Sequence, residues 1–122
     1  MPTILVVDDE PSIRTMVRLM LARLPCTVIE ARDGAEALTI ARQERPQLIL
    51  LDVVMPHPDG WAVLETLQQE GLTQNSPVVL ISGSVVLDIE TAQGLGAIAI
   101  LPKPFQVTAL RALVQDLLML PV

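Results

Sequence analysis

Short runs of aliphatic residues alternate along the chain with longer stretches in which apolar residues recur at helical spacing, and this alternation occurs five times. Three of the runs are nearly continuous aliphatics, which is typical of strands buried on both faces of a parallel sheet. The pattern therefore predicts five strands, over residues 4–7, 27–29, 48–51, 78–81 and 98–101.

An amphipathic helix is predicted after each strand. In the first helix, apolar residues recur at helical spacing from Ile13 to Leu24, and arginines lie elsewhere on its surface. Asp9 stands shortly before this helix, ahead of Pro11, and is predicted to be its N-cap. The other helices are predicted over residues 34–43, 61–69, about 86–93 and about 107–120.

Five successive strand–helix units predict an α/β fold, a doubly wound parallel sheet with helices on both faces. Each crossover between parallel strands must pass over one face of the sheet and is nearly always right-handed. The length of 122 residues suits one domain, so residues 1–122 are predicted to form a single unit. In such sheets, functional residues gather beyond the carboxyl ends of the strands.

Composition narrows the classes of protein to consider. Hydrophobic residues make up 51% of the chain, which argues against disorder. The formal net charge of -6 disfavours binding to nucleic acid. No apolar run approaches the ~20 residues of a membrane helix, and the single Cys26 suits a reducing compartment. We therefore expect a soluble, cytoplasmic protein without a membrane or nucleic-acid partner.

Polar residues follow four of the predicted strands. Asp8-Asp9-Glu10 follow the first, Asp52 the third, Ser82 the fourth, and Lys103, the only lysine, the fifth. On a parallel sheet these strand ends share one edge, so their side chains should meet. Adjacent carboxylates repel one another unless a cation compensates them, and oxygen ligands favour Mg²⁺. Such a site suits phosphoryl transfer with Asp52 as the nucleophile.

Each of these residues also has a simpler interpretation when it is taken alone. Asp8 and Asp9 could cap the first helix, and Asp52 and Ser82 could be turn residues. Lys103 could be an ordinary surface lysine. Only their joint placement at four strand ends favours the functional interpretation.

Four segments together resemble the receiver domain of two-component response regulators: VVDDE, LLDVVMPHPDG, ISGS and LPKPF, in this order and spacing. The resemblance covers essentially the whole chain and implies a flavodoxin-like sheet of strand order 2-1-3-4-5. It implies that a sensor histidine kinase or phosphotransfer protein donates a phosphoryl group to Asp52, and that slow hydrolysis follows. The chain would then be a signalling switch more than a metabolic enzyme.

The same resemblance implies roles for individual residues. Asp9 and Asp52 would bind Mg²⁺ directly, Asp8 through water, and Val54 through its backbone carbonyl. Ser82 would donate a hydrogen bond to the phosphoryl group. Lys103 would pair with that group, and the bond from Lys103 to Pro104 would be cis. Gly60 would let the loop after Asp52 turn back into the next helix.

By the same resemblance, three positions bear on how such a switch would transmit and lose its signal. Ile100 replaces the aromatic residue that changes rotamer in many receivers, so a shift of the loop after Ser82 is the expected means of transmission. Val54 and Ser84 flank the expected path of the hydrolytic water, and Val54 cannot hydrogen-bond to it. We therefore expect slow loss of the phosphoryl group.

The fourth and fifth strand–helix units are more apolar than one small core requires. This predicts an interface on the surface of the fourth helix, fifth strand and fifth helix, for a second copy as a homodimer or for another partner. The alternative is core packing followed by a disordered tail. The residues concerned are Val85, Val86, Leu87, Ile89, Leu95, Ile98, Ile100 and the final LLMLPV.

Two other functions remain open from the sequence. The chain could be an interaction module of receiver shape that never takes phosphate, although the retained Asp9, Asp52, Ser82 and Lys103 argue against it. It could also be a small aspartyl phosphatase, for which no substrate pocket is evident. The output could be a separate downstream protein target or an output domain of a longer chain.

Overall fold

Five parallel strands form one sheet in the order β2-β1-β3-β4-β5 in the computed structural model, which describes residues 1–83 and 89–120. This confirms the predicted α/β, flavodoxin-like fold and its strand order. The strands are β1 (Thr3–Val7), β2 (Thr27–Ala31), β3 (Leu48–Asp52), β4 (Val78–Ser82) and β5 (Ala97–Pro102).

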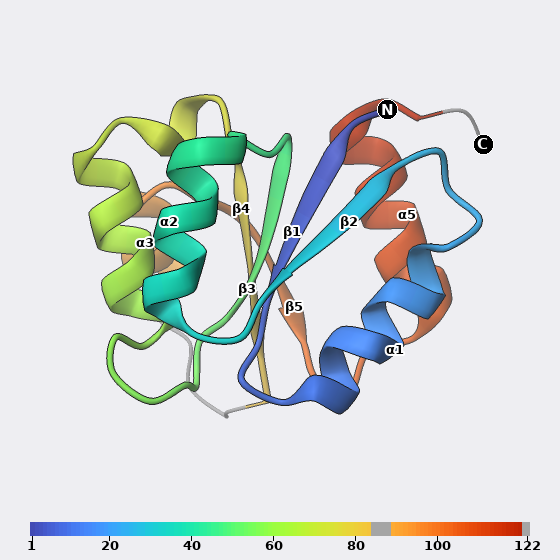
Figure 1. The fold of residues 1–122 in the computed structure, drawn as a ribbon, viewed down its shortest axis with the longest axis horizontal. Helices are drawn as coiled ribbons and strands as arrows, with labels where there is room; N and C mark the ends of the chain where they lie inside the picture. Colours follow the sequence, from blue (N-terminus) through green and yellow to red (C-terminus); the bar gives the residue numbers. More distant parts are fainter. Residues whose placement is uncertain (84–88, 121–122) are drawn as a thin grey trace.

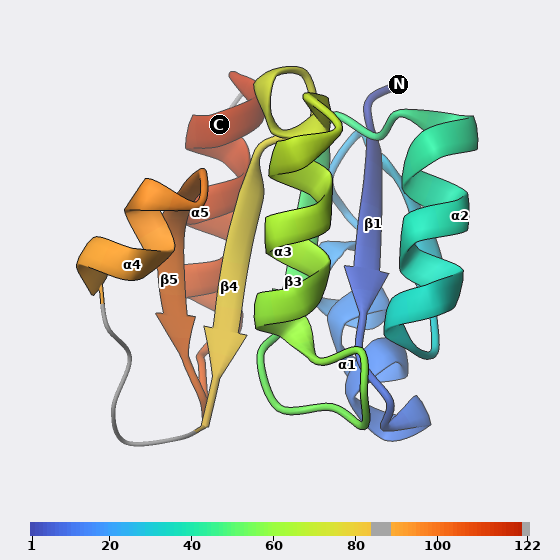
Figure 2. The same cartoon turned by 90° about the vertical axis from the view of Figure 1, so that its left-hand side faces the viewer.

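Helices cover both faces of the sheet (Figures 1 and 2). The helices α1 (Pro11–Leu21) and α5 (Val107–Leu118) lie on one face. The other face carries α2 (Gly34–Glu44), α3 (Gly60–Gln69) and the short α4 (Ile89–Gly94), with a 3-10 turn, η1 (Leu72–Gln74), after α3. None of the helices in the described ranges has the length and apolar character that crossing a bilayer requires.

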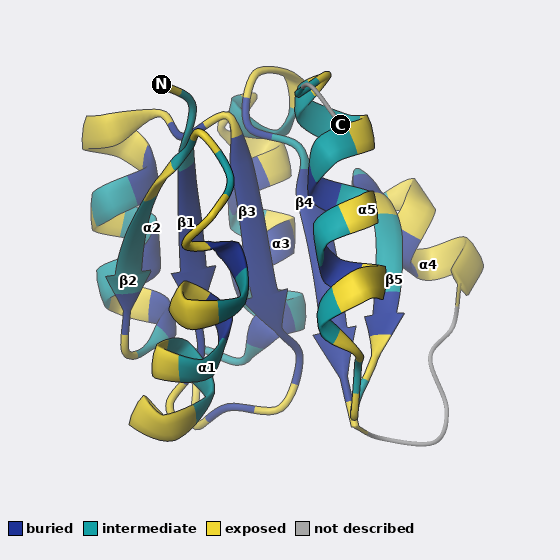
Figure 3. Cartoon of the chain, turned by 90° about the vertical axis from the view of Figure 1, so that its right-hand side faces the viewer, coloured by how far each residue is buried: buried dark blue, intermediate teal, exposed yellow. Residues whose placement is uncertain are grey.

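The central strands are buried on both faces because successive side chains point to opposite sides of the sheet. Leu5 and Val7 of β1 pack under α2 and α3, whereas Ile4 and Val6 pack under α1 and α5. All five residues of β3 are buried, as are all five of β4. Figure 3 shows this contrast between the buried strands and the exposed outer surface of α1 and α5. Double burial explains the continuous aliphatic runs in the sequence.

The predicted N-cap of the first helix is wrong. Pro11 is the first helical residue, so the N-cap is Glu10, and Asp9 lies one position too early. No side chain caps this helix; instead the Glu10 N–H donates to Asp8 Oδ1 at 2.9 Å. Aspartates do cap two other helices. Asp33 accepts from the N–H of Glu36 in α2, and Asp59 accepts from the N–H of Ala62 in α3.

The remaining helix boundaries differ from the prediction by a few residues. The predicted third helix begins at Gly60 instead of residue 61 because Asp59 is the cap. The predicted fifth helix ends at Leu118 instead of residue 120. The next residue, Met119, adopts a left-handed conformation with φ of 55° and caps the helix. Of the predicted fourth helix, residues 86–88 lie outside the described part, and the described part is Ile89–Gly94.

Gly60 joins α3 closely to the end of β3. A Cβ at this position would collide with the carbonyl oxygen of Asp52 and lie 2.6 Å from the Cα of Val53. Rigid backbone cannot yield to such contacts as a flexible side chain can. We expect Gly60→Ala to lower the free energy of unfolding by about 1–3 kcal/mol or more, as overpacking does, measured by urea denaturation.

The matched control for this change is Gly94→Ala at the end of α4. Apart from its own helix backbone and chain neighbours, no atom of the described residues lies within 4 Å of a Cβ built at Gly94, so this variant should keep or slightly raise the stability. Equal stability of the two variants would contradict the close approach at Gly60.

Candidate functional site

Three polar side chains are buried together at the carboxyl edge of the sheet. Asp8 follows β1, Asp52 ends β3 and Ser82 ends β4, with relative exposures of 1%, 3% and 2%. Carboxylates are rarely buried this deeply unless they are paired. The structure thus brings together the side chains that the sequence placed at separate strand ends.

Lys103 provides the pairing. It follows β5, and its Nζ lies 3.1 Å from Asp8 Oδ2 and 3.5 Å from Asp52 Oδ1. Its backbone N–H donates to the carbonyl of Ser82 at 2.7 Å, which holds the ends of β4 and β5 together. The bond from Lys103 to Pro104 is cis, as the resemblance implied, and so is the bond from His57 to Pro58. One ammonium therefore bridges two buried carboxylates.

The surroundings shift the acidity of both partners. Burial, together with the negative charge of Asp8, raises the pKa of Asp52 above its ordinary value, and Lys103 opposes this only in part. Burial alone would lower the pKa of Lys103, but its hydrogen bond to Asp8 and the charge of Asp52 raise that pKa overall. Lys103 consequently remains a cation at neutral pH.

An acidic group lies beside this bridge. Carboxylate oxygens of Asp8, Asp9 and Glu10 all lie within 4.8 Å of one another, with Asp8 buried and the other two exposed. Mg²⁺ takes oxygen ligands in an octahedron and keeps several waters, so a set of carboxylates that is open to solvent on one side suits it. Among the described residues Asp52 is not a member of this group; it faces Lys103 instead.

An open cavity of about 430 Å³ connects the buried acid to solvent. It is lined by Glu10, Asp52, Val54, Gly83 and Lys103. Val54 is 61% exposed as a residue, while its backbone N–H donates to Asp52 Oδ1 at 3.3 Å. The sequence placed Glu10 at the strand end but gave it no role; only its adjacency to two aspartates indicated its place at the site.

The predicted apolar surface is present in part. Ile89 of α4 and Ile98 of β5 are 57% and 47% exposed. Leu95 and Ile100 instead pack against the core beneath α2 and α3. Leu117, Leu118 and Leu120 pack against the core beneath α1 and α5, whereas Met119 between them is 89% exposed. The predicted residues Ser84, Val85, Val86, Leu87, Pro121 and Val122 lie outside the described residues.

A family model decides what kind of domain carries this site. The model of the response regulator receiver domain matches residues 4–115. The chain belongs to the response regulator receiver family. The resemblance inferred from the four sequence segments is thereby confirmed.

Similar proteins place this receiver domain in two-component signalling. The probable transcriptional regulator ycf27 of Cyanophora paradoxa is 40% identical over 116 residues, which cover 94% of this chain and 47% of that protein. A protein-glutamate methylesterase/protein-glutamine glutaminase of Myxococcus xanthus is 40% identical over 106 residues, 83% of this chain and 29% of that protein. The chain thus spans about half the length, or less, of these relatives.

A solved structure supports the same assignment over nearly the full length of both chains. The chemotaxis protein CheY4 of Vibrio cholerae superposes with a TM-score of 0.87 at 30% identity, covering 96% of this chain and 98% of that one.

The raised pKa of Asp52 gives a stability prediction. A carboxyl group whose pKa is raised by folding stabilises the fold while it is protonated, and that contribution is lost as the pH rises through the raised pKa. Asp52→Asn removes the buried charge, so without divalent cations the variant should melt at a higher temperature than wild type at pH 7. The difference should shrink as the pH falls toward the ordinary value of 3.8.

Thermal denaturation at several pH values measures this effect, with Glu65→Gln as the control. Glu65 is exposed on α3, and its neutralisation should change the melting temperature little at any pH. An Asp52→Asn variant no more stable than wild type at pH 7 would contradict the destabilising charge.

Proposed function

We propose that this receiver domain accepts a phosphoryl group on Asp52 from a phosphohistidine of a sensor histidine kinase or phosphotransfer protein. The observation that carries the proposal is the bridge at the edge of the sheet. Asp52 is buried, faces the Lys103 ammonium at 3.5 Å, and still borders a cavity open to solvent. A nucleophile held in this way can be reached by a phosphoryl donor without moving the sheet.

The proposed step is a displacement at phosphorus. A carboxylate oxygen of Asp52 forms a P–O bond, the P–N bond of the phosphohistidine breaks, and the imidazole nitrogen keeps the electron pair. Lys103 offsets negative charge on the phosphoryl oxygens. The Ser82 hydroxyl donates a hydrogen bond to one of them. Both side chains are held by strand ends, so little reorganisation is needed.

Asp8, Asp9, Asp52 and the carbonyl of Val54 are the residues that we propose to hold Mg²⁺. The exposed carboxylate of Asp9 beside the buried Asp8 supports a cation that keeps part of its water shell. When bound, Mg²⁺ supplies positive charge against the repulsion of the carboxylates and of the incoming phosphoryl oxygens. Glu10 also lines the cavity and adds negative charge at its entrance.

The output of the switch is proposed to pass through the surface formed by α4, β5 and α5. Ile89 and Ile98 give this surface exposed apolar side chains, which suits a protein partner or a second copy as a homodimer. The related proteins named above include a transcriptional regulator and a methylesterase, and the domain could likewise serve an output domain or a separate target.

Intact mass after incubation with acetyl phosphate and Mg²⁺ tests the proposed chemistry. We expect wild type to gain one phosphoryl group, and we expect no gain when Mg²⁺ is withheld or when Asp52→Asn is used. No gain by a folded wild type that binds Mg²⁺ would favour a phosphate-independent interaction module. Turnover of a generic phosphomonoester would favour an aspartyl phosphatase.

The exposed Val54 side chain leads to a prediction about the lifetime of the phosphorylated state. Valine cannot orient the water that attacks phosphorus, so loss of the phosphoryl group should be slow. Val54→Asn supplies a hydrogen-bonding group and should speed this loss about 5-fold, the equivalent of one hydrogen bond of ~1 kcal/mol. Release of inorganic phosphate from the phosphorylated protein measures the rate.

Val54→Ala is the control that distinguishes the effect of an added hydrogen bond from the effect of a larger cavity. It opens the cavity without adding a polar group, and we expect its rate to stay near that of wild type. An unchanged rate for Val54→Asn, or an equal increase in both variants, would refute the proposed effect.

A further inference from the structure

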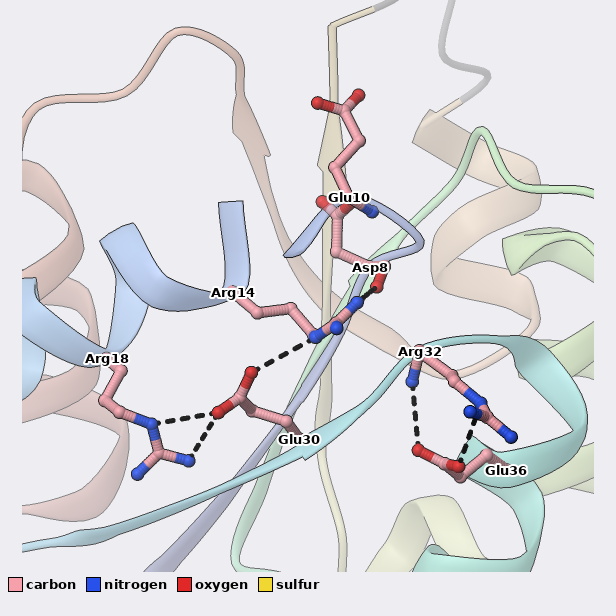
Figure 4. A network of polar contacts seen from close by, with 7 residues as sticks. All are labelled: Asp8, Glu10, Arg14, Arg18, Glu30, Arg32 and Glu36. Atoms are coloured by element: carbon pink, nitrogen blue, oxygen red, sulfur yellow. Dashed lines mark hydrogen bonds and ion pairs between the residues drawn. The ribbon is translucent and has the colours of Figure 1, made fainter. Parts of the chain in front are cut away.

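Arg14 of α1 links the edge strand β2 to the backbone beside the acidic group (Figure 4). Its Nη1 donates to the carbonyl oxygen of Asp8 at 2.7 Å, and its Nε donates to Glu30 Oε1 at 3.1 Å. The side chain of Arg14 is only 15% exposed. One planar guanidinium thus connects a carboxylate on β2 to the main chain at the end of β1.

Arg18 holds the other side of the same carboxylate. Its Nε and Nη2 donate to Glu30 Oε2 at 2.9 and 2.7 Å, but no hydrogen bond of Arg18 reaches Asp8 in the described structure. The hydrogen bond from Arg18 is the main reason that the pKa of Glu30 is lowered, with Arg14 adding to it. Glu30 is therefore a fixed anion that orients Arg14 toward Asp8.

The carbonyl that Arg14 holds controls the position of two aspartates. A peptide unit is planar and contains the Cα atoms of both residues that it joins. A hydrogen bond to the carbonyl of Asp8 therefore restrains the Cα of Asp8 and that of Asp9. Two further hydrogen bonds hold this part of the chain. The Asp8 N–H donates to Ala31 O at 3.2 Å, and the Glu10 N–H donates to Asp8 Oδ1.

We propose that Arg14 is a positioning residue for Mg²⁺ binding, which holds the Asp8–Asp9 peptide so that both carboxylates keep the arrangement an octahedral ion requires. The inference rests on the proposed function, since it concerns the same Mg²⁺ site. Mg²⁺ tolerates little departure from octahedral geometry, so a small displacement of one ligand weakens binding. Residues that orient metal ligands commonly change metal affinity 10- to 100-fold when they are replaced.

The sign of the effect separates positioning from simple electrostatics. Arg14 is a cation close to the acidic group, and removing a cation should tighten the binding of another cation. Loss of positioning should weaken it. Arg14→Gln removes both the charge and the hydrogen bond to Asp8, and we expect Mg²⁺ binding to weaken about 10-fold.

Arg18→Gln is the matched control. It removes an arginine from the same helix and from the same Glu30 carboxylate but leaves the bond between Arg14 and Asp8 in place. Calorimetric titration of the full chain with Mg²⁺ gives the dissociation constants, and melting temperatures show the effect on stability. We expect Arg18→Gln to bind Mg²⁺ as wild type does, even where its melting temperature falls.

Other results would overturn the assignment. Tighter Mg²⁺ binding by Arg14→Gln would mean that charge repulsion dominates, and equal weakening in both variants would mean that the arginines only attach α1 to β2. If Arg14→Gln does not fold, Arg14→Lys decides. It keeps the charge but not the planar fork that reaches two partners, so its binding should weaken as well, and wild-type affinity would reject the role.

Failure of this inference can be told apart from failure of the proposed function. Wild-type protein that binds Mg²⁺ and gains a phosphoryl group, beside an Arg14→Gln variant of unchanged affinity, rejects only the role of Arg14. Wild-type protein that neither binds Mg²⁺ nor gains a phosphoryl group rejects the proposed function, and the inference falls with it.

Discussion

The ammonium of Lys103 between Asp8 and Asp52 is the interaction on which the site depends. Two carboxylates buried side by side repel each other and lose hydration, and both effects disfavour their ionised forms. The positive charge of Lys103 lies close to both carboxylates and offsets their negative charge. Removing Lys103 would leave both carboxylates uncompensated, and losing the partner of a buried charge in this way typically costs about 3–5 kcal/mol, whereas removal of the Asp52 charge leaves Lys103 paired with Asp8. The pocket therefore forms as a unit of three charged groups.

The sheet makes this arrangement possible because its strands are parallel and buried on both faces. Parallel strands bring their carboxyl ends to one edge, and packing from both sides fixes the positions of those ends. Asp52 is the last residue of the fully buried β3, and Gly60 lets α3 begin directly against it. A run of aliphatics ending in an aspartate is thus the sequence of a carboxylate held at the end of a rigid strand.

The sequence predicted the strands, their order and the residues at their ends, because hydrophobic periodicity and a four-segment resemblance both report on them. It did not predict the N-cap of α1, since any of three consecutive acids could precede Pro11. It also missed the role of Glu30. A glutamate on an edge strand looks like a solvated side chain until the fold brings Arg14 and Arg18 against it from a helix. Such contacts depend on tertiary packing, and periodicity carries no information about them.

Asp8 and Asp9 are adjacent in sequence but differ in how firmly they are held. Asp8 is fixed through its N–H by β2, through its carbonyl by Arg14, and through its carboxylate by Glu10 and Lys103. Asp9 is exposed, and the peptide that it shares with Asp8 couples its position to that residue. A buried carboxylate beside an exposed one suits the Mg²⁺ site that we propose, because the buried group is fixed by the fold while the exposed group leaves room for the waters that Mg²⁺ retains.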